Sequence, residues 1–292
     1  PLKFGPETLT HVTCARVRLT VTDDSGHTAE GWGETPLSVQ WAWPSSASVE
    51  QRLRTMQSFC HQLAEAWCSA NLGRGHALAL GHRFLEDQLP GLTDRFNATS
   101  RAGLDPMPRL AALICASAFD LALHDAFGIL NGVTYATYGP EFLTDDLGSY
   151  LDSEPGAPSF AGQFPADFLV KHPPKVLPAW HLVGGKDPIS SEELTGDEPD
   201  DGYPVLLRDW ITRDGLTCLK IKLRGDDEAW DYARVVQVGQ IAEETGVHWL
   251  STDFNCTVND PDYVNSILDR LMKDEPRTFG KILYVEQPFP YD

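Results

Sequence analysis

The sequence TCLKIK at residues 217–222 is an apolar segment of strand length that carries two lysines at alternating positions. Because successive side chains on a strand point to opposite faces, Lys220 and Lys222 point to the same side. If the apolar residues between and beside them face covering helices, both ammonium groups face inward, where mutual repulsion lowers their pKa values. A lysine with a lowered pKa can act as a base near neutral pH. An edge strand with two lysines on its surface is the alternative interpretation.

Two further apolar segments downstream also end in polar residues. One ends at Asp253-Phe254-Asn255 and the other at Glu286-Gln287-Pro288. The three segments follow one another at intervals of roughly 30 residues, the length of one βαβ unit. Such alternation predicts parallel strands and an α/β, TIM-like (β/α) barrel, whose active site lies at the C-terminal ends of the strands. The expected order is strand 175–183, helix 205–214, strand 217–223, helix 226–245, strand 248–253, helix 261–273 and strand 282–286.

Two carboxylates at the ends of adjacent strands can share one hard cation. Asp253 and Glu286 occupy such positions, and Mg²⁺ prefers oxygen ligands while keeping some positions for water or substrate. Capping of the strand ends is the alternative for each acid taken singly, but the lysine pair one unit upstream favours the metal site. Asn255 either orients the metal shell or a bound water, or only starts a loop. A metal beside an amine base suits proton abstraction next to a carboxylate.

The N-terminal half has a different pattern. Alternating apolar residues at 11–22, a turn at 23–26 and a return at 28–34 predict a β-hairpin. Helical patterns follow at 48–70, 75–89 and 107–130, so we expect an α+β domain over residues 1–147. The barrel domain is expected over residues 148–292. Its loop 184–204 is rich in acids, and is either a lid over the barrel mouth or a solvated acidic excursion.

Composition limits the classes of partner. The 292 residues carry a net charge of −19, from 42 acids and 23 bases, which argues against binding to nucleic acid or to an anionic membrane surface. No apolar run approaches the roughly 20 residues of a membrane span. The six cysteines are scattered without CxxC spacing, which predicts a cytosolic, cytoplasmic protein with reduced thiols. A barrel needs about eight strands, and only four are predicted, so we expect the barrel to be incomplete in this chain.

The motifs resemble those of a known family. The KxK, DxN and EQP segments, in this order, are similar to the second, third and fourth barrel strands of the enolase superfamily, in its mandelate racemase and muconate lactonizing enzyme group. Gly31-Trp32-Gly33-Glu34 and the helical segment 118–125, with Gly128, resemble the capping-domain hairpin and helix of that family. The resemblance covers most of the chain.

This resemblance implies a Mg²⁺ site in which Asp253 and Glu286 are two of three ligands. Lys222 would be the base that removes the proton α to a substrate carboxylate, and Lys220 would lie against that carboxylate and keep the pKa of the base low. The third acidic ligand and a second acid/base would follow residue 292. Trp41 and Trp43 lie where the capping loop of the family reaches over the substrate, so they are substrate-binding candidates, with domain-interface packing as the alternative.

The expected substrate is a small-molecule carboxylate, and the expected assembly is a homo-oligomer, as is common in this family. Racemisation, epimerisation or cycloisomerisation through a metal-stabilised enediolate is the favoured reaction, because the KxK pair matches those branches best. An acid-sugar dehydratase of the same superfamily is the first alternative. A non-catalytic barrel relative and another metal-dependent barrel enzyme, such as an aldolase or hydrolase, are the others.

Overall fold

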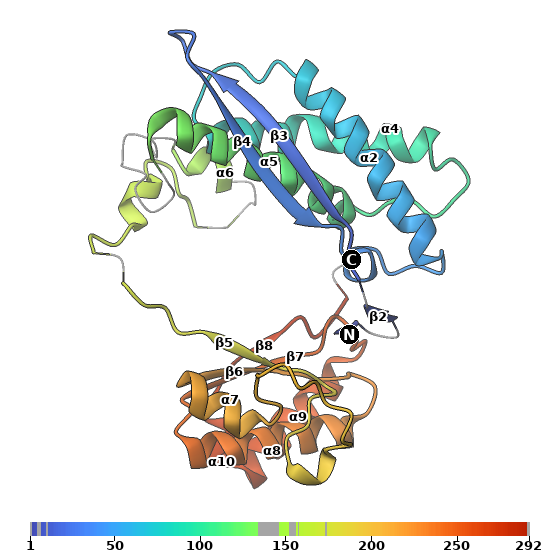
Figure 1. Ribbon diagram of the computed structural model, residues 1–292, viewed down its shortest axis with the longest axis vertical. Helices are drawn as coiled ribbons and strands as arrows, with labels where there is room; N and C mark the ends of the chain where they lie inside the picture. The colour runs from blue at the N-terminus through green and yellow to red at the C-terminus, as the bar shows by residue number, and fades with distance from the viewer. Residues whose placement is uncertain are drawn as a thin grey trace. The chain divides into compact units, whose positions relative to one another are not determined.

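The computed structural model describes residues 2–4, 7–9, 11–133, 146–151, 156, 158–172 and 174–290. It divides into two compact units, one mainly from residues 9–172 and the other mainly from residues 174–290 (Figure 1). The sequence analysis placed the domain boundary between residues 147 and 148, which is earlier in the chain than the division between these two units. Two short strands near the N-terminus, β1 (Leu2–Phe4) and β2 (Glu7–Leu9), pair with each other.

The first unit is built on the predicted hairpin. Strands β3 (Cys14–Thr22) and β4 (Thr28–Pro36) pair antiparallel, from Cys14 opposite Pro36 to Thr22 opposite Thr28. The carboxylate of Asp23 closes the turn by accepting hydrogen bonds from the backbone N–H groups of Ser25 and His27. The hairpin prediction is therefore confirmed.

Helices pack on this hairpin, and two of them match the sequence pattern closely. They are α2 (Val49–Ser69) and α5 (Arg109–Asn131). The sequence analysis ended its second helical pattern at residue 89, so it did not predict α4 (Leu89–Thr99). The structure uses Pro90 in the first turn of α4, where no N–H is needed. The remaining helices are α1 (Val39–Ala42), α3 (Ala77–Arg83), a π-helical turn (Phe84–Gln88), α4 (Leu89–Thr99) and α6 (Gly148–Leu151).

The glycines of the Gly-Trp-Gly-Glu segment allow β4 to lie directly on α5. A Cβ added at Gly31 would lie 2.1 Å from the backbone nitrogen of Ala126, and one at Gly33 would lie 2.0 Å from the carbonyl oxygen of Ala118. No side chain fits between backbones this close. The two glycines of this motif therefore allow β4 to pack directly against the backbone of α5.

Helix α5 is the core helix of this unit. Among the described residues it is the one helix long and apolar enough to cross a membrane by length and composition, although the sequence pattern predicted no apolar run of that length. Half of its most apolar 18-residue window is buried inside the protein. The hairpin and α2 pack against it, so its apolar composition has a role in the core.

Replacing Gly33 by alanine should destabilise the first unit. The added methyl group meets the backbone of α5, so we expect the free energy of unfolding to fall by about 3 kcal/mol. Gly91→Ala is the matched control, because a Cβ there meets only the flexible end of Arg95, at 3.4 Å, and should stabilise α4 slightly. Urea unfolding measures both. Equal stability of the two variants would contradict this account of the motif.

The second unit confirms the predicted strand–helix alternation. Four parallel strands lie in the order β5 (Trp180–Val183), β6 (Cys218–Lys222), β7 (Trp249–Asp253) and β8 (Ile282–Glu286). The connecting helices cover one face of the sheet (Figure 1). They are α7 (Leu207–Asp214), α8 (Glu228–Thr245), α9 (Pro261–Asp274) and the short α10 (Pro276–Phe279).

The two faces of the sheet differ in chemistry. Leu219 and Ile221 are fully buried in the core beneath the helices, and Lys220 and Lys222 therefore point to the opposite face, as the alternation predicts. That opposite face also carries partly exposed aromatic residues. The rings of Trp180 on β5 and Tyr284 on β8 lie 5.6 Å apart, although two strands separate β5 from β8.

The first strand of this sheet is shorter than predicted. Residues 175–179 are not in a strand, and Val176 and Leu177 are exposed. Pro174 and Pro178 have no N–H to donate to a neighbouring strand, which explains why pairing begins only at Trp180. The prediction of a buried strand over 175–183 was wrong for its first half.

The acidic loop 184–204 contains one short 3₁₀ helix, Ser191–Glu193. Several of its acids cap its own turns. Glu193 accepts a hydrogen bond from the N–H of Ser190, and Glu198 accepts one from the N–H of Thr195. These contacts give the acids a local structural role, and the function of the loop as a lid stays a prediction.

Candidate active site

The candidate site lies where β6, β7 and β8 end. Lys222, Asp253 and Glu286 occupy paired positions on these three neighbouring strands: Lys222 lies opposite Asp253, and Asp253 lies opposite Glu286. Lys220 lies two residues before Lys222 on the same face. The register of the sheet thus brings together four side chains that are up to 66 residues apart in the chain.

The carboxylate of Asp253 lies between the two lysines. Lys222 Nζ donates to Asp253 Oδ2 over 2.5 Å, and Lys220 Nζ lies 3.0 Å from the same oxygen. Lys220 also donates to Glu286 Oε1 over 2.6 Å. Lys222 donates to the side-chain oxygen of Asn255 over 2.6 Å. All five polar residues that the sequence placed at these strand ends therefore belong to one connected network.

Burial strengthens these interactions. The side chain of Asp253 has no exposed surface, whereas those of Lys220, Lys222 and Glu286 are between 19% and 29% exposed. Burial alone would raise the pKa of Asp253, but hydrogen bonds from Lys222, from the N–H of Asn255 and from Lys220 outweigh it and lower the pKa. Asp253 is therefore held as an anion.

The sequence analysis expected mutual repulsion to lower the pKa of both lysines, and for Lys220 this is wrong. Burial lowers the pKa of Lys220, but the hydrogen bonds and negative charges of Glu286 and Asp253 outweigh burial and raise it. The sequence showed two amines on one strand. It did not show how close the cross-strand carboxylates come.

The backbone after β7 and β8 adopts an uncommon conformation. Asn255, Cys256 and Gln287 have φ angles of 52°, 60° and 42°, which residues other than glycine seldom adopt. Hydrogen bonds hold this conformation: the N–H of Asn255 donates to Asp253 Oδ1 over 2.8 Å, and the N–H of Cys256 donates to the carbonyl of Gln287 over 2.7 Å. Strained backbone of this kind occurs often at functional sites.

The donor set suits Mg²⁺, and it is incomplete. Mg²⁺ is commonly bound by one or two carboxylates together with waters, and Asp253 and Glu286 supply two carboxylates at adjacent register positions. Asn255 adds an amide oxygen beside them. Within the described ranges, no group of three His, Cys, Asp or Glu side chains could hold a metal ion. A third acidic ligand is therefore not among these residues.

Trp41 and Trp43 belong to the N-terminal unit. The ring of Trp43 is 1% exposed, lies under the guanidinium of Arg101 and donates from Nε1 to Asp105 over 3.3 Å. Trp41 packs against the same core. The structure thus gives Trp43 a packing role, and contact of either tryptophan with a substrate stays a prediction.

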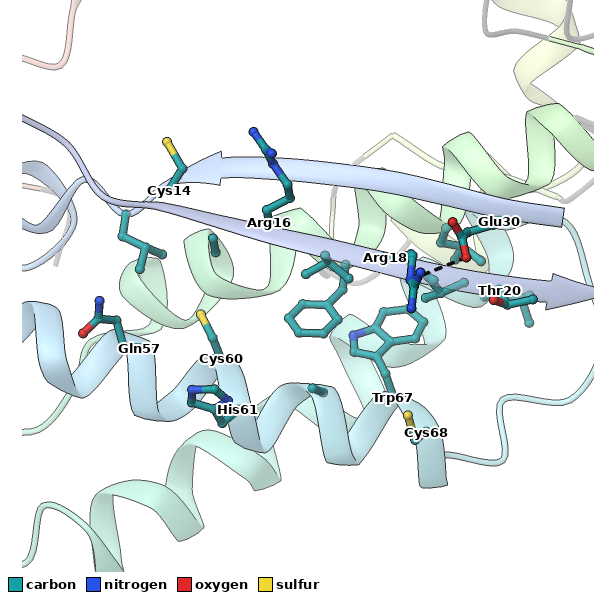
Figure 2. A pocket seen from close by; sticks show the side chains of 18 of the residues that line it. Cys14, Arg16, Arg18, Thr20, Glu30, Gln57, Cys60, His61, Trp67 and Cys68 are labelled. Carbon is teal, nitrogen blue, oxygen red and sulfur yellow. Dashed lines mark ion pairs between the residues drawn. The ribbon is translucent and has the colours of Figure 1, made fainter.

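The N-terminal unit also contains a groove of about 900 Å³ between β3 and α2 (Figure 2). Its lining includes Cys14, Gln57, Cys60, His61 and Trp67, which the sequence analysis did not select. Its lining includes one ion pair, between Arg18 and Glu30, but no lysine and no second acid, so we place the candidate active site at the ends of β6, β7 and β8.

Sequence reasoning missed Asp231, a fully buried acid on α8. Its carboxylate accepts hydrogen bonds from the N–H groups of Arg224 and Gly225 and from the hydroxyl of Tyr263. In the sequence it looks like one more acid in the first turn of a helix, where acids are common. Because Arg234 follows at i,i+3 on the same helix, an ordinary helical ion pair would account for Asp231, and no signal in the sequence marked it as a buried acid.

Comparisons with known proteins give only weak structural likenesses. No protein-family model and no curated protein sequence matches the chain. A mandelate racemase/muconate lactonizing protein from Herpetosiphon aurantiacus is similar with a TM-score of 0.45 and 13% identity, over 98% of this chain and 61% of that one. A racemase from Streptomyces coelicolor A3(2) with bound magnesium is similar with a TM-score of 0.40 and 16% identity, over 94% of this chain and 55% of that one.

The chain therefore spans less than two thirds of the length of both structures. The first of them is from the group that the segments around Lys222, Asp253 and Glu286 resemble. Identities this low carry no information about reaction or substrate.

The charge on Asp253 predicts a pH dependence of stability. The pKa of Asp253 is lower in the folded state than its ordinary value of 3.8, so its contribution is complete above that value and is lost as the pH falls through the folded-state pKa. Asp253→Asn should lower the free energy of unfolding by about 3 kcal/mol at pH 7, because it leaves two ammonium groups without a shared anion. The difference from wild type should shrink below about pH 4.

Urea unfolding at a series of pH values measures this difference. Asp269→Asn, on the exposed side of α9, is the matched control and should change stability little at any pH. A difference for Asp253→Asn that stays constant down to pH 2 would show that the charge of Asp253 does not stabilise the fold.

Proposed function

We propose that this chain belongs to a Mg²⁺-dependent enzyme that removes the α-proton of a small carboxylate substrate. The observation that carries the proposal is the convergence of Lys220, Lys222, Asp253 and Glu286 on the ends of three parallel strands. The lysines, together with a divalent cation that the two acids would hold, can neutralise a carboxylate substrate and the negative charge that grows when its α-proton leaves. The resemblance of these segments to the enolase superfamily supports the same chemistry.

Each residue has a defined part in this proposal. Lys222 accepts the α-proton at Nζ, and Asn255 orients that amine through its side-chain oxygen. Lys220 lies against the substrate carboxylate and offsets its charge. Asp253 and Glu286 would hold Mg²⁺, which supplies a Lewis acid for the developing enediolate. The fixed register of β6, β7 and β8 sets the distance between the proton acceptor and the acids.

The proposal also assigns roles to the rest of the protein. The four-stranded sheet would be part of a TIM-like barrel, in which the sheet face that carries the lysines and the partly exposed aromatic residues is the inner face. The N-terminal unit would act as the capping domain, with Trp41 as the remaining substrate-contact candidate because Trp43 is packed in the core, and the protein would form a homo-oligomer. Racemisation, epimerisation or cycloisomerisation is the proposed outcome. Dehydration of an acid sugar begins with the same proton transfer.

Exchange of the α-proton with solvent tests this proposal directly. In D₂O with Mg²⁺, a panel of 2-hydroxy acids, acid sugars and amino-acid derivatives should include a compound that gains deuterium at its α-carbon, measured by NMR. Lys222→Ala should slow this exchange by at least about 100-fold, because it removes the general base. Mg²⁺ binding, measured by calorimetry, should persist in that variant.

Two variants serve as controls for the exchange measurement. Asp253→Asn should weaken Mg²⁺ binding, and Lys273→Ala, on the last turn of α9, should leave both exchange and Mg²⁺ binding unchanged. Exchange that continues in Lys222→Ala at the wild-type rate would exclude Lys222 as the base. Mg²⁺ binding by Asp253→Asn as tight as that of wild type would exclude Asp253 as a ligand.

A further inference from the structure

The carboxylate of Asp231 lies among three hydrogen-bond donors, and within the described part of the chain it forms no ion pair. Its Oδ1 accepts from the N–H of Arg224 over 2.7 Å, and its Oδ2 accepts from the N–H of Gly225 over 2.9 Å and from the hydroxyl of Tyr263 over 2.7 Å. The residue has no exposed surface. Burying a carboxylate costs free energy unless its oxygens accept hydrogen bonds. Here both oxygens of Asp231 accept them.

The two backbone donors lie directly after the proposed base. Residues 223–225 begin the loop that follows Lys222, so Asp231 fixes the direction in which the chain leaves β6. Gly225 has a φ of 72°, and a Cβ added there would lie 2.1 Å from Oγ1 of Thr257. The loop after β6 is thus packed tightly against the loop after β7, which carries Asn255.

The third donor reaches the same region from the other side. Tyr263 lies on α9, which follows the β7 loop, and its ring packs edge-on against Phe254 with the ring centroids 6.2 Å apart. Phe254 is the residue after Asp253. The N–H of Leu223, next to Lys222, donates to the carbonyl of Asp253 over 2.9 Å. One buried carboxylate therefore joins the segments that carry Lys222 and Asp253.

The neighbouring turn of α8 holds another loop in a similar way. Arg234 is buried and donates to the carbonyl oxygens of Gly184 and Asp187, over 2.5 Å and 2.8 Å, in the loop that follows β5. The N-terminal half of α8 thus organises the loops after two strands. Of these contacts, only those of Asp231 reach the segments of the proposed site.

From these contacts we propose that Asp231 is a positioning residue, which holds the loops after β6 and β7 so that Lys222 and Asp253 keep their mutual placement. It touches neither substrate nor metal, and acts through the backbone of Arg224 and Gly225 and through Tyr263. The inference rests on the proposed function for its catalytic meaning. Its structural content is independent of that function.

Hydrogen exchange and Mg²⁺ titration of the full chain test the proposal. Asp231→Asn places an amide group, with two donors of its own, against three donors. We expect amide exchange at Arg224 and Gly225 to rise about tenfold, with a smaller rise over residues 255–258, while exchange in β3, β4 and α5 stays unchanged. The Kd for Mg²⁺ should rise about tenfold, as when other supports of metal ligands are removed.

A milder variant and a matched control complete this test. Tyr263→Phe removes one donor and leaves both backbone hydrogen bonds of Asp231, so it should fold and show a smaller change of the same pattern. Asp226→Asn is the matched control, because this exposed acid pairs with the side chain of Arg224 and not with its backbone; it should change neither measurement. If Asp231→Asn does not fold, Tyr263→Phe decides.

The possible results separate the two proposals. Unchanged exchange at residues 224, 225 and 255–258 in Asp231→Asn and Tyr263→Phe would overturn the positioning role. A uniform rise of exchange over the whole second unit would also overturn it, because Asp231 would then only stabilise the fold. A wild-type chain that binds no Mg²⁺ would contradict the proposed function, and the exchange pattern would still decide the role of Asp231.

Discussion

The hydrogen bonds from two lysines to Asp253 Oδ2 are the interaction on which the rest of the site depends. They require that β6 and β7 pair in one register, with Lys222 opposite Asp253. A shift of one residue would turn the lysines into the apolar core beneath the helices, where a charge without a partner is very costly. Fold and site are therefore specified by the same alternation of apolar and charged residues.

The surrounding chain maintains this arrangement by backbone contacts. The loops after β7 and β8 are joined through the N–H of Cys256 and the carbonyl of Gln287, and the loop after β6 is tied to α8 by Asp231. These hydrogen bonds hold the backbone of the residues with positive φ in a conformation that it would otherwise leave. A site assembled from three strand ends is thus held as one body, as electrostatic preorganisation requires.

Much of the second unit and of the candidate site could be predicted from the sequence, because these features depend on local patterns of apolar and charged residues. The alternation in residues 217–222 fixed which way Lys220 and Lys222 point, and the spacing of the apolar segments predicted β6, β7 and β8 within one or two residues. The features that the sequence did not predict depend on contacts between segments far apart in the chain. The raised pKa of Lys220 comes from carboxylates on other strands, and the role of Asp231 depends on Tyr263, 32 residues away. The start of β5 depended on how prolines interrupt pairing.

A crystal structure of this chain grown with Mg²⁺ tests the central claim most directly. The account predicts that carboxylate oxygens of Asp253 and Glu286 lie about 2.1 Å from one cation, with Lys220 and Lys222 on the same side of the sheet and within reach of a carboxylate placed beside it. Side chains of these four residues that point to different places, with no cation between the two acids, would contradict the account.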